Sequence, residues 1–409
     1  MTPDVRHVCV QWPRLGPYHL ARLRALHALL DARGGRLTAL ETSRADATYD
    51  WRLETEPVPF GRVSALGDDA PEHAPPARTR RAVSDALDRV DPDAVAITSY
   101  STPDAQAALA WCRRRRRPAV MLFDSRADDA PRVGWREAVK RTLVRQYDAA
   151  LVAGTPQADY LTSLGMWPDS VFRPVDVVDN AFFARGAARA LAEGALPHPG
   201  PYLLSVNRFL PRKNVDALVR AYARYRDHAR AAGRAPWPLV LLGDGPGRPG
   251  LERLAGDGVV FGGFQQARAL PAWYAGAGLY VHPALSDPWG LVVNEAMAAG
   301  LPVLVSTGAG CALDLVGGNG ATFDPGDQIA LADALVRLTG PNADRATMGA
   351  RSREIIAGYT PQAFAEGLWA AVEAARAHAD RPMSAGARLV LATLGVVARR
   401  HRAFHSVDA

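Results

Sequence analysis

The 409-residue sequence is poor in cysteine and contains no long hydrophobic run. Its three cysteines, Cys9, Cys112 and Cys311, are widely spaced and odd in number, which argues against a disulfide framework and favours a reducing compartment. No apolar run reaches the roughly 18 residues that a membrane-spanning helix needs. The N-terminus lacks the pattern of a secretory signal peptide. These absences together predict a cytoplasmic protein.

Lysine is also nearly absent, because 48 residues are basic but only Lys140 and Lys213 are lysines. A bias toward arginine would remove lysine wherever either cation serves, so the remaining lysines are enriched where a compact ammonium is needed. The net charge of +6 is modest, and the densest basic run, residues 113–117, has no interleaved aromatic residues for base stacking. We therefore expect no nucleic-acid partner. We interpret the run as the solvated end of a helix, with attraction to an anionic acceptor or lipid surface as the alternative.

Short apolar segments alternate with amphipathic ones along the whole chain, which predicts an α/β protein with parallel sheets. A chain of this length exceeds one ordinary core, so we expect two doubly wound, Rossmann-like domains. Strands are predicted in the first half at His7–Trp12, Arg36–Thr42, Ala94–Ser99, Ala119–Phe123 and Ala149–Ala153. Strands are predicted in the second half at Tyr202–Val206, Leu239–Leu242, Val259–Phe261, Leu279–His282 and Pro302–Ser306.

Composition also suggests where these domains begin and end. A stretch of small residues with proline and glycine follows residue 183. We therefore predict a first domain over 1–185, a linker over 186–200, a second domain over 201–375 and a helical tail over 376–409. We expect the tail to pack on the first domain, and the alternative is a basic amphipathic helix in weak contact with a membrane surface. A Pro- and Ala-rich stretch over 54–76 is predicted to be a long loop.

The ends of the predicted strands in the second half carry unusual side chains. Arg208 and Lys213 follow the first of these strands and precede a helix. Two cations beside a helix N-terminus make a site for a diphosphate, through charge and free N–H groups together. A later strand is followed by Asp287, Gly290 and Glu295, with the two carboxylates eight positions apart. The glycine allows close approach of a ligand to the backbone, and the carboxylates can accept hydrogen bonds from sugar hydroxyls.

A second glycine-rich turn, Gly243-Asp-Gly-Pro-Gly247, points elsewhere. The strand after it ends at Phe261-Gly262-Gly263 with no acid that could hold a ribose, which argues against a nicotinamide-dependent enzyme. We interpret this turn as a tight strand-to-helix connection beside the site.

From Ser205 to Ser306 the sequence resembles the nucleotide-binding domain of retaining glycosyltransferases of family four, the group 1 type. The resemblance implies the GT-B fold, in which two Rossmann-like domains face each other across a cleft. It implies that Arg208 and Lys213 bind the diphosphate, that Glu295 binds the ribose, and that the backbone of Gly290, Leu291 and Val292 meets the distal phosphate. Asp287 stands where the family usually has glutamate. It keeps the charge on a shorter side chain, which affects contacts with the donor sugar.

The first half resembles the same family more loosely and would form the acceptor side. Gly16 matches a glycine that faces the donor phosphates, and His19 is a candidate to face the acceptor hydroxyl, with a helix-capping or surface role as the alternative. The polar stretch that follows the strand at 119–123 resembles a subgroup of these enzymes. The candidate acceptor-side residues are Tyr18, His19, Ser125, Asp128, Arg132 and Lys140.

The resemblance implies transfer of a sugar from a nucleoside-diphosphate sugar to an acceptor hydroxyl, with retention of anomeric configuration. It implies no obligatory metal or other cofactor. Arg208, Lys213, Asp287 and His19 are the candidate catalytic residues. Two alternatives share the fold: a nucleotide-sugar 2-epimerase, and a non-catalytic protein that binds a nucleotide sugar.

Overall fold

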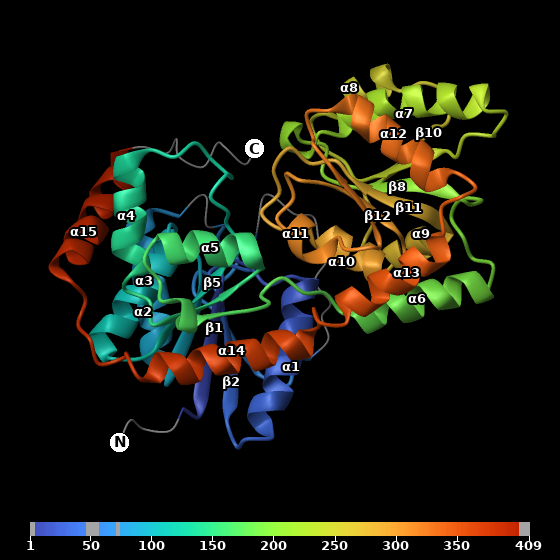
Figure 1. Cartoon of the computed structure of the whole chain (residues 1–409). Helices are drawn as coiled ribbons and strands as arrows, with labels where there is room; N and C mark the ends of the chain where they lie inside the picture. Colours follow the sequence, from blue (N-terminus) through green and yellow to red (C-terminus); the bar gives the residue numbers. More distant parts are fainter. Residues whose placement is uncertain (1–4, 46–56, 71–73, 401–409) are drawn as a thin grey trace. The chain divides into compact units, whose positions relative to one another are not determined.

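The computed structural model describes residues 5–45, 57–70 and 74–400. The chain divides into two compact units (Figure 1). Unit 1 comprises Met1–Val177 and Pro361–Ala409, and unit 2 comprises Val178–Thr360. Each unit is built on its own parallel sheet, which confirms the predicted pair of doubly wound α/β domains.

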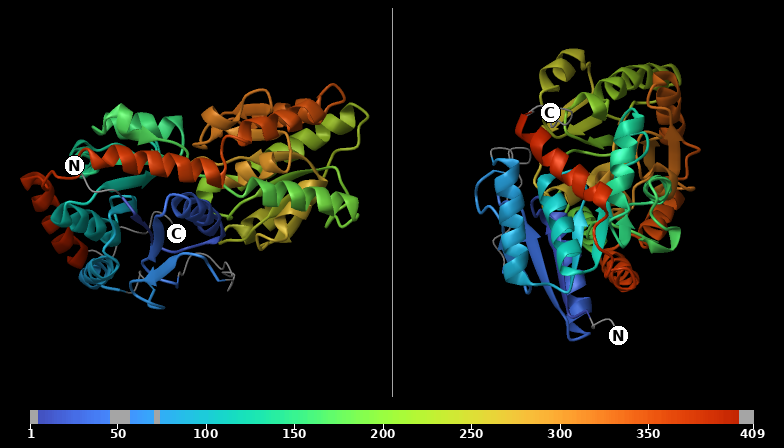
Figure 2. Two further views of the ribbon diagram at one scale, coloured as in Figure 1. Left: turned by 90° about the horizontal axis from the view of Figure 1, so that it is seen from below. Right: turned by 90° about the vertical axis from the view of Figure 1, so that its left-hand side faces the viewer.

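Unit 1 has a seven-stranded parallel sheet in the order β3-β2-β1-β4-β5-β6-β7. Its strands are β1 (His7–Trp12), β2 (Arg36–Glu41), β3 (Gly61–Ser64), β4 (Ala94–Thr98), β5 (Ala119–Phe123), β6 (Ala149–Val152) and β7 (Val171–Phe172). Its helices are α1 (Pro17–Asp31), α2 (Pro76–Val90), α3 (Pro103–Arg115), α4 (Gly134–Val144), α5 (Thr155–Ser163), α14 (Pro361–Arg376) and α15 (Ala385–Arg400), with a 3-10 turn at Pro168–Ser170. In unit 1, α2 packs against α3, while α14 packs against α1 and against β5, β6 and β7 (Figure 1, Figure 2).

Unit 2 has a six-stranded parallel sheet in the order β10-β9-β8-β11-β12-β13. Its strands are β8 (Tyr202–Val206), β9 (Leu239–Leu242), β10 (Val259–Gly263), β11 (Ala277–His282), β12 (Val303–Ser306) and β13 (Gly320–Phe323). Its helices are α6 (Asn180–Ala192), α7 (Val215–Ala231), α8 (Arg248–Leu254), α9 (Leu270–Gly276), α10 (Leu291–Ala298), α11 (Ala312–Leu315), α12 (Gln328–Thr339) and α13 (Arg345–Ile356), with the 3-10 turn η2 at Pro211–Lys213. Helices α7 and α12 cover one face of this sheet, and α6, α9 and α10 cover the other (Figure 1).

The apolar sequence of the central strands explains this layering. All four residues of β9 are buried, as expected of a parallel strand with helices on both faces. Helix α7 buries one stripe at helical spacing, with Leu218, Tyr222 and Tyr225 packed into the core of unit 2. The sheet is therefore held on both faces, and its carboxyl edge is left for loops.

The division into units differs from the predicted boundaries. The predicted linker over 186–200 lies within unit 2, and much of it belongs to α6. Asp179 caps this helix by accepting a hydrogen bond from the N–H of Phe182 (2.9 Å). The chain returns to unit 1 after Thr360, so α14, which was predicted to end the second domain, completes the first unit. Helix α15 of the tail contacts α4 and α2 in unit 1.

Two local expectations were wrong. The stretch predicted to be a long loop contains β3, the edge strand that pairs with β2, although 54–56 and 71–73 lie outside the described residues. Arg113, which was placed at the solvated end of a helix, is buried in an ion pair with Asp148. Asp148 also contacts Arg381 (3.2 Å), so its carboxylate ties the tail to unit 1. Within the described part of the chain, no helix has the length and apolar character needed to cross a membrane.

Candidate functional site

The strand order of unit 2 reverses between β8 and β11, which lie side by side although the strands β9 and β10 separate them in sequence. In open parallel sheets, ligands bind at the carboxyl ends of the strands beside such a reversal. The loop after β8 carries Arg208 and Lys213, and the loop after β11 carries Asp287. The fold therefore brings these two predicted motifs to one point.

Lys213 and Asp287 are in direct contact, with Nζ lying 2.5 Å from Oδ2. Asn214, the residue after Lys213, stabilises the loops that form this contact. It adopts a left-handed backbone conformation (φ 56°), and its side-chain amide donates to the carbonyls of Pro283 (3.1 Å) and Pro325 (3.0 Å). The backbone N–H of Leu285 also donates to the carbonyl of the residue before Lys213 (2.8 Å). These bonds join the two loops, so the lysine and the carboxylate face each other.

A third residue holds the same carboxylate oxygen. The Nε2 atom of His282, the last residue of β11, lies 2.9 Å from Asp287 Oδ2. The side chain of His282 is fully buried, and those of Asp287 and Lys213 are only 11% and 13% exposed. Burial raises the pKa of Asp287, but the positive charge of Lys213 and the hydrogen bond with His282 outweigh it, so this pKa lies well below its ordinary value. Asp287 is therefore an ionised, oriented carboxylate.

The backbone of Asp287 is fixed as well. Its N–H donates to the carbonyl of Gly308 (3.1 Å), and its own carbonyl accepts from the N–H of Gly310 (2.9 Å). A side chain on Gly308 would clash, because a Cβ there would lie 2.3 Å from the carbonyl oxygen of Leu285. The two loops after β11 and β12 thus pack backbone to backbone, and this packing requires glycine.

Helix α10 begins beside this cluster. Gly290 precedes it with φ 102°, a conformation that favours glycine. A Cβ at Gly290 would also lie 3.3 Å from Nε2 of His282. Leu291 and Val292 form the first turn, whose backbone N–H groups point out of the helix N-terminus and suit an anion. The predicted phosphate-facing segment is therefore next to the predicted lysine and aspartate.

Glu295 lies one turn further into α10 and is fully buried. Its Oε2 atom accepts a hydrogen bond from the hydroxyl of Tyr274 on α9 (2.7 Å). In this structure its carboxylate has no exposed surface, so a ribose could reach it only after covering side chains move. Its ribose-binding role stays a prediction.

The loop that carries Arg208 is packed against the glycine-rich turn after β9. A Cβ at Gly243 would lie 1.8 Å from the carbonyl oxygen of Asn207, and the carbonyl of Asp244 accepts the N–H of Phe209 (2.9 Å). Arg208 is half-buried between these backbone contacts. The glycines of this turn serve close packing beside the site, as the strand-to-helix interpretation expected.

In unit 1, Gly16 and His19 interact with each other at the start of α1. The N–H of Gly16 donates to Nδ1 of His19 (2.9 Å), so the histidine caps the helix. Its ring lies 4.7 Å from that of Trp12, centre to centre. Burial and the charge of Arg22 lower the pKa of His19 to about 3. The capping role is therefore present in the structure, and Tyr18 beside it is half-buried.

Two other predicted acceptor-side residues, Lys140 and Arg132, both contact Tyr160 in unit 1. Lys140 Nζ lies 2.8 Å from Glu137 Oε1 and 2.8 Å from the hydroxyl of Tyr160. The guanidinium of Arg132 lies over the same tyrosine ring, 5.1 Å from its centre. A hollow of about 440 Å³ opens here, and it is lined by Arg126, Ala127, Asp128, Arg132, Pro156, Asp159, Tyr160 and Ser163. Asp128 and Arg132 thus line the hollow, whereas Ser125 and Lys140 lie outside its lining.

Comparison with known proteins decides the family of unit 2. A family model described as glycosyl transferases group 1 matches residues 200–340, which span the cluster described above. The chain carries a group 1 glycosyltransferase domain. The D-inositol 3-phosphate glycosyltransferase of Nocardia farcinica is similar to this chain, with 31% identity over 263 residues, which are 60% of this chain and 57% of that protein. The chain thus spans little more than half the length of this relative.

Solved structures resemble most of the chain in fold. Sucrose-phosphate synthase from Thermosynechococcus elongatus has a TM-score of 0.68 at 21% identity, covering 89% of this chain and 97% of that one. Anabaena HepE in complex with UDP and glucose has a TM-score of 0.66 at 16% identity, covering 89% and 98%. The expected GT-B fold, a group 1 domain preceded by a second doubly wound domain, is confirmed at the level of architecture.

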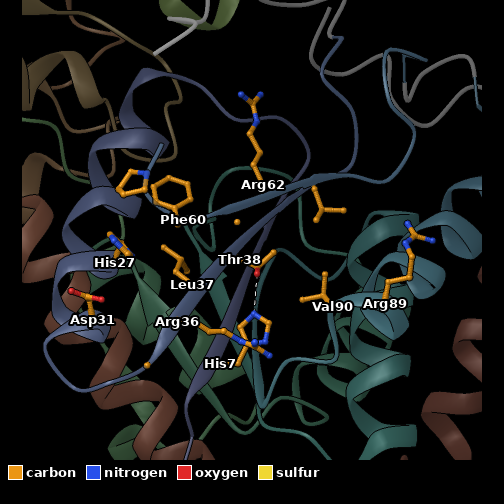
Figure 3. Close-up of a pocket in the computed structure, with 14 residues that line it drawn as sticks. His7, His27, Asp31, Arg36, Leu37, Thr38, Phe60, Arg62, Arg89 and Val90 are labelled. Carbon is orange, nitrogen blue, oxygen red and sulfur yellow. Dashed lines mark hydrogen bonds between the residues drawn. The ribbon is translucent and has the colours of Figure 1, made fainter. Parts of the chain in front are cut away.

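A larger hollow of about 560 Å³ lies in unit 1, away from every predicted site residue. It is formed at the amino ends of β1 and β2 and beside β3, with His7, Thr38 and Phe60 among its lining. Figure 3 shows that the guanidinium groups of Arg62 and Arg89 lie on different sides of it and do not converge. We therefore place the candidate site in the group 1 domain. Across the described ranges, no three His, Cys, Asp or Glu side chains are grouped so as to hold a metal ion.

Two residues of the group 1 domain contact the site but were not among the predicted site residues. His282 contacts Asp287, and Tyr274 contacts Glu295. A histidine that ends an otherwise apolar buried strand, just before a proline and five residues before an acid, is the signal that could have identified His282. Tyr274 lies in an ordinary amphipathic helix, so its sequence carries no comparable signal.

Proposed function

We propose that this protein transfers a sugar from a nucleoside-diphosphate sugar to an acceptor hydroxyl with retention of anomeric configuration and without an obligatory metal. The observation that carries the proposal is the contact of Lys213 with Asp287 at the strand reversal of a group 1 domain, beside the N-terminus of α10. This arrangement offers cations and backbone N–H groups to a diphosphate and a carboxylate to sugar hydroxyls.

Cleavage of the anomeric bond builds negative charge on the leaving diphosphate. Lys213 and Arg208 and the N–H groups at the start of α10 would stabilise that charge, which is the role of preorganised donors in acyl and phosphoryl chemistry. In the free protein Asp287 holds Lys213 in place at 2.5 Å. A diphosphate that binds here can therefore contact a lysine side chain that is already positioned in the site.

The state of Asp287 bears on the stereochemistry. Its Oδ2 atom is engaged by Lys213 and His282, and its pKa is lowered, so the carboxylate is a weak nucleophile. We propose that retention arises from attack on the front face of the sugar, with the leaving phosphate accepting the acceptor's proton. Glu295 would contribute to ribose binding, and Tyr18, His19, Ser125, Asp128, Arg132 and Lys140 would lie on the acceptor side.

The names of similar proteins support a nucleotide-sugar donor. The Nocardia farcinica relative is named a glycosyltransferase acting on D-inositol 3-phosphate, and the HepE structure holds UDP and glucose. We carry over to this chain the donor class only, a nucleoside-diphosphate sugar with a hexose.

A ligand screen tests this function. Thermal unfolding is measured with UDP, GDP and ADP and with their glucose or mannose derivatives, because a ligand that binds the native state raises the midpoint. We expect one nucleoside diphosphate and its sugar to raise the midpoint. The donor is then incubated with the protein and no acceptor. Slow release of the nucleoside diphosphate supports a transferase, and interconversion of the sugar supports the epimerase. Tight binding without any release supports a non-catalytic binding protein.

A further inference from the structure

Both protein contacts of the Asp287 side chain go to the same oxygen. Lys213 Nζ lies 2.5 Å from Oδ2, and His282 Nε2 lies 2.9 Å from it. Among the described residues, no side chain contacts Oδ1. One carboxylate oxygen is thus held by two side chains, and the other is not.

The two contacts differ in stiffness. Lys213 reaches Oδ2 at the end of a flexible four-carbon stem. His282 is the last residue of a buried strand, its ring is fully buried, and the ring of Tyr280 stacks on it (6.5 Å between centres, 17° between planes). The backbone of Gly290 lies close to the ring as well, since a Cβ there would be 3.3 Å from Nε2. The imidazole is therefore held more rigidly than the lysine, and its hydrogen bond restricts the position of Oδ2.

The hydrogen of this bond is also determined. An ionised carboxylate only accepts, so Nε2 of His282 carries the hydrogen and donates it to Asp287. In the neutral ring Nδ1 is then an acceptor, and it is buried with no partner among the described residues. A buried acceptor without a partner lowers stability. Packing alone would therefore favour an apolar side chain at position 282. The presence of a histidine there is explained by a role other than packing.

From this geometry we infer that His282 is a positioning residue, which fixes the Asp287 carboxylate so that Oδ1 faces a hydroxyl of the donor sugar. The inference rests on the proposed function and names one more residue for the same site. When a diphosphate binds to Lys213, the ammonium group is shared between the diphosphate and Asp287, and its hold on the carboxylate weakens. The bond from His282 is the contact that keeps the carboxylate oriented during transfer.

Three variants of the full chain isolate this bond. His282→Gln places an amide N–H about where Nε2 lies. His282→Asn is polar but too short to reach Asp287, and His282→Phe keeps the ring shape without the donor. Tyr280→Phe is the matched control, because it changes the neighbouring ring at the hydroxyl, which lies 3.5 Å from the carbonyl of Val206, and leaves Asp287 untouched.

Each variant is compared with the wild type in three measurements: the thermal midpoint, the affinity for UDP, GDP or ADP, and the release of that nucleoside diphosphate from its glucose or mannose derivative without acceptor. In the proposed site Asp287 contacts the donor sugar and not the nucleoside diphosphate. We therefore expect unchanged nucleoside-diphosphate affinity in all variants. We expect donor cleavage to fall roughly 10- to 100-fold in His282→Asn and His282→Phe, the range for losing a hydrogen bond to a charged group. We expect His282→Gln to recover most of the rate.

Two results would overturn the inference while leaving the proposed function intact. One is a wild-type rate of donor cleavage in His282→Asn or His282→Phe. The other is a loss of nucleoside-diphosphate affinity that parallels the loss of rate and is not recovered by His282→Gln, which would show that the histidine supports only the loop. If the wild-type protein binds none of the three nucleoside diphosphates, the proposed function itself fails, and the role of His282 fails with it.

Discussion

Lys213 and Asp287 are 74 residues apart in sequence, yet Nζ lies 2.5 Å from Oδ2. The contact joins the loops after β8 and β11, the two strands between which the sheet order reverses. One of the two lysines in the chain is thus held by a buried acid at the point where the fold favours a ligand. Each of the two side chains also compensates the charge of the other.

Replacing either cation of this site is expected to lower activity. We expect Lys213→Ala and Arg208→Ala each to reduce the turnover rate at least ~100-fold, because each removes a donor from the leaving diphosphate. Arg220→Ala is the control, since it removes an exposed cation from α7. Steady-state kinetics with the donor from the ligand screen makes the test, and near-normal rates in both variants would refute the proposed donor site.

Asp287→Asn is expected to destabilise unit 2 by about 3 kcal/mol at neutral pH, because it leaves a buried lysine without its counter-charge. The folded pKa of Asp287 is lowered, so the carboxylate's contribution is full above about pH 4 and is lost as the pH falls further. The difference in thermal midpoint between wild type and variant should therefore shrink below about pH 4. A difference that is constant from pH 7 to pH 3 would show that the charge pair does not stabilise the fold.

Gly243→Ala is expected to be strongly destabilising and to reduce donor binding. Its Cβ would lie 1.8 Å from the carbonyl oxygen of Asn207 and would displace the loop that carries Arg208. Gly263→Ala separates crowding from backbone strain, since Gly263 also has a positive φ (69°) but has no atom within 4 Å of the added Cβ. Thermal midpoints and ligand affinities for both variants test this. Equal effects would mean that strain alone explains the glycine.

His19 is expected to stay neutral through the physiological pH range, because its pKa is lowered to about 3. The folded state therefore disfavours the proton, and stability should decrease as the pH falls from about 6.5 toward 3. His19→Gln should weaken this dependence while leaving the shape of the activity profile between pH 6 and 8 unchanged. An inflection near pH 6.5 that disappears in the variant would instead indicate acid–base chemistry by His19.

Asp148→Ala is expected to destabilise unit 1 by about 3–5 kcal/mol, since it leaves the buried guanidinium of Arg113 unpaired. Arg381→Ala should cost less, because Arg381 is partly exposed and Asp148 keeps its other partner. Asp68→Ala, which breaks an exposed pair with Arg44, should have no measurable effect. Thermal unfolding of the three variants orders these contributions. An Asp148→Ala variant that is as stable as the Asp68→Ala variant would contradict the expectation.

Much of the fold was predictable because local pattern and tertiary structure agree. The strands predicted at His7–Trp12, Ala119–Phe123 and Tyr202–Val206 match the observed bounds. These segments are either continuously apolar or clearly amphipathic, so burial and periodicity point to the same structure. The prediction of a long loop was wrong at β3, a polar edge strand that pairs only with β2 and has little apolar character.

The site was predictable in part. Residues that follow strand ends, such as Lys213 and Asp287, could be placed together because parallel strands share one carboxyl edge. The sequence could not show that His282 and Tyr274 bond to the two acids, because those contacts depend on side-chain directions across neighbouring elements. It also could not show that Arg113 turns inward, since one buried arginine looks the same as its exposed neighbours in a run of five.

The return of the chain to unit 1 has a consequence for the order of events during synthesis. Unit 2 is one continuous segment, whereas the core of unit 1 includes Phe364, Leu368 and Val372 of α14, which are fully buried. The group 1 domain can complete its core once Thr360 has been made. Unit 1, whose first segment precedes unit 2 in the sequence, lacks α14 until residues 361–376 have been made, so its core is completed after that of unit 2.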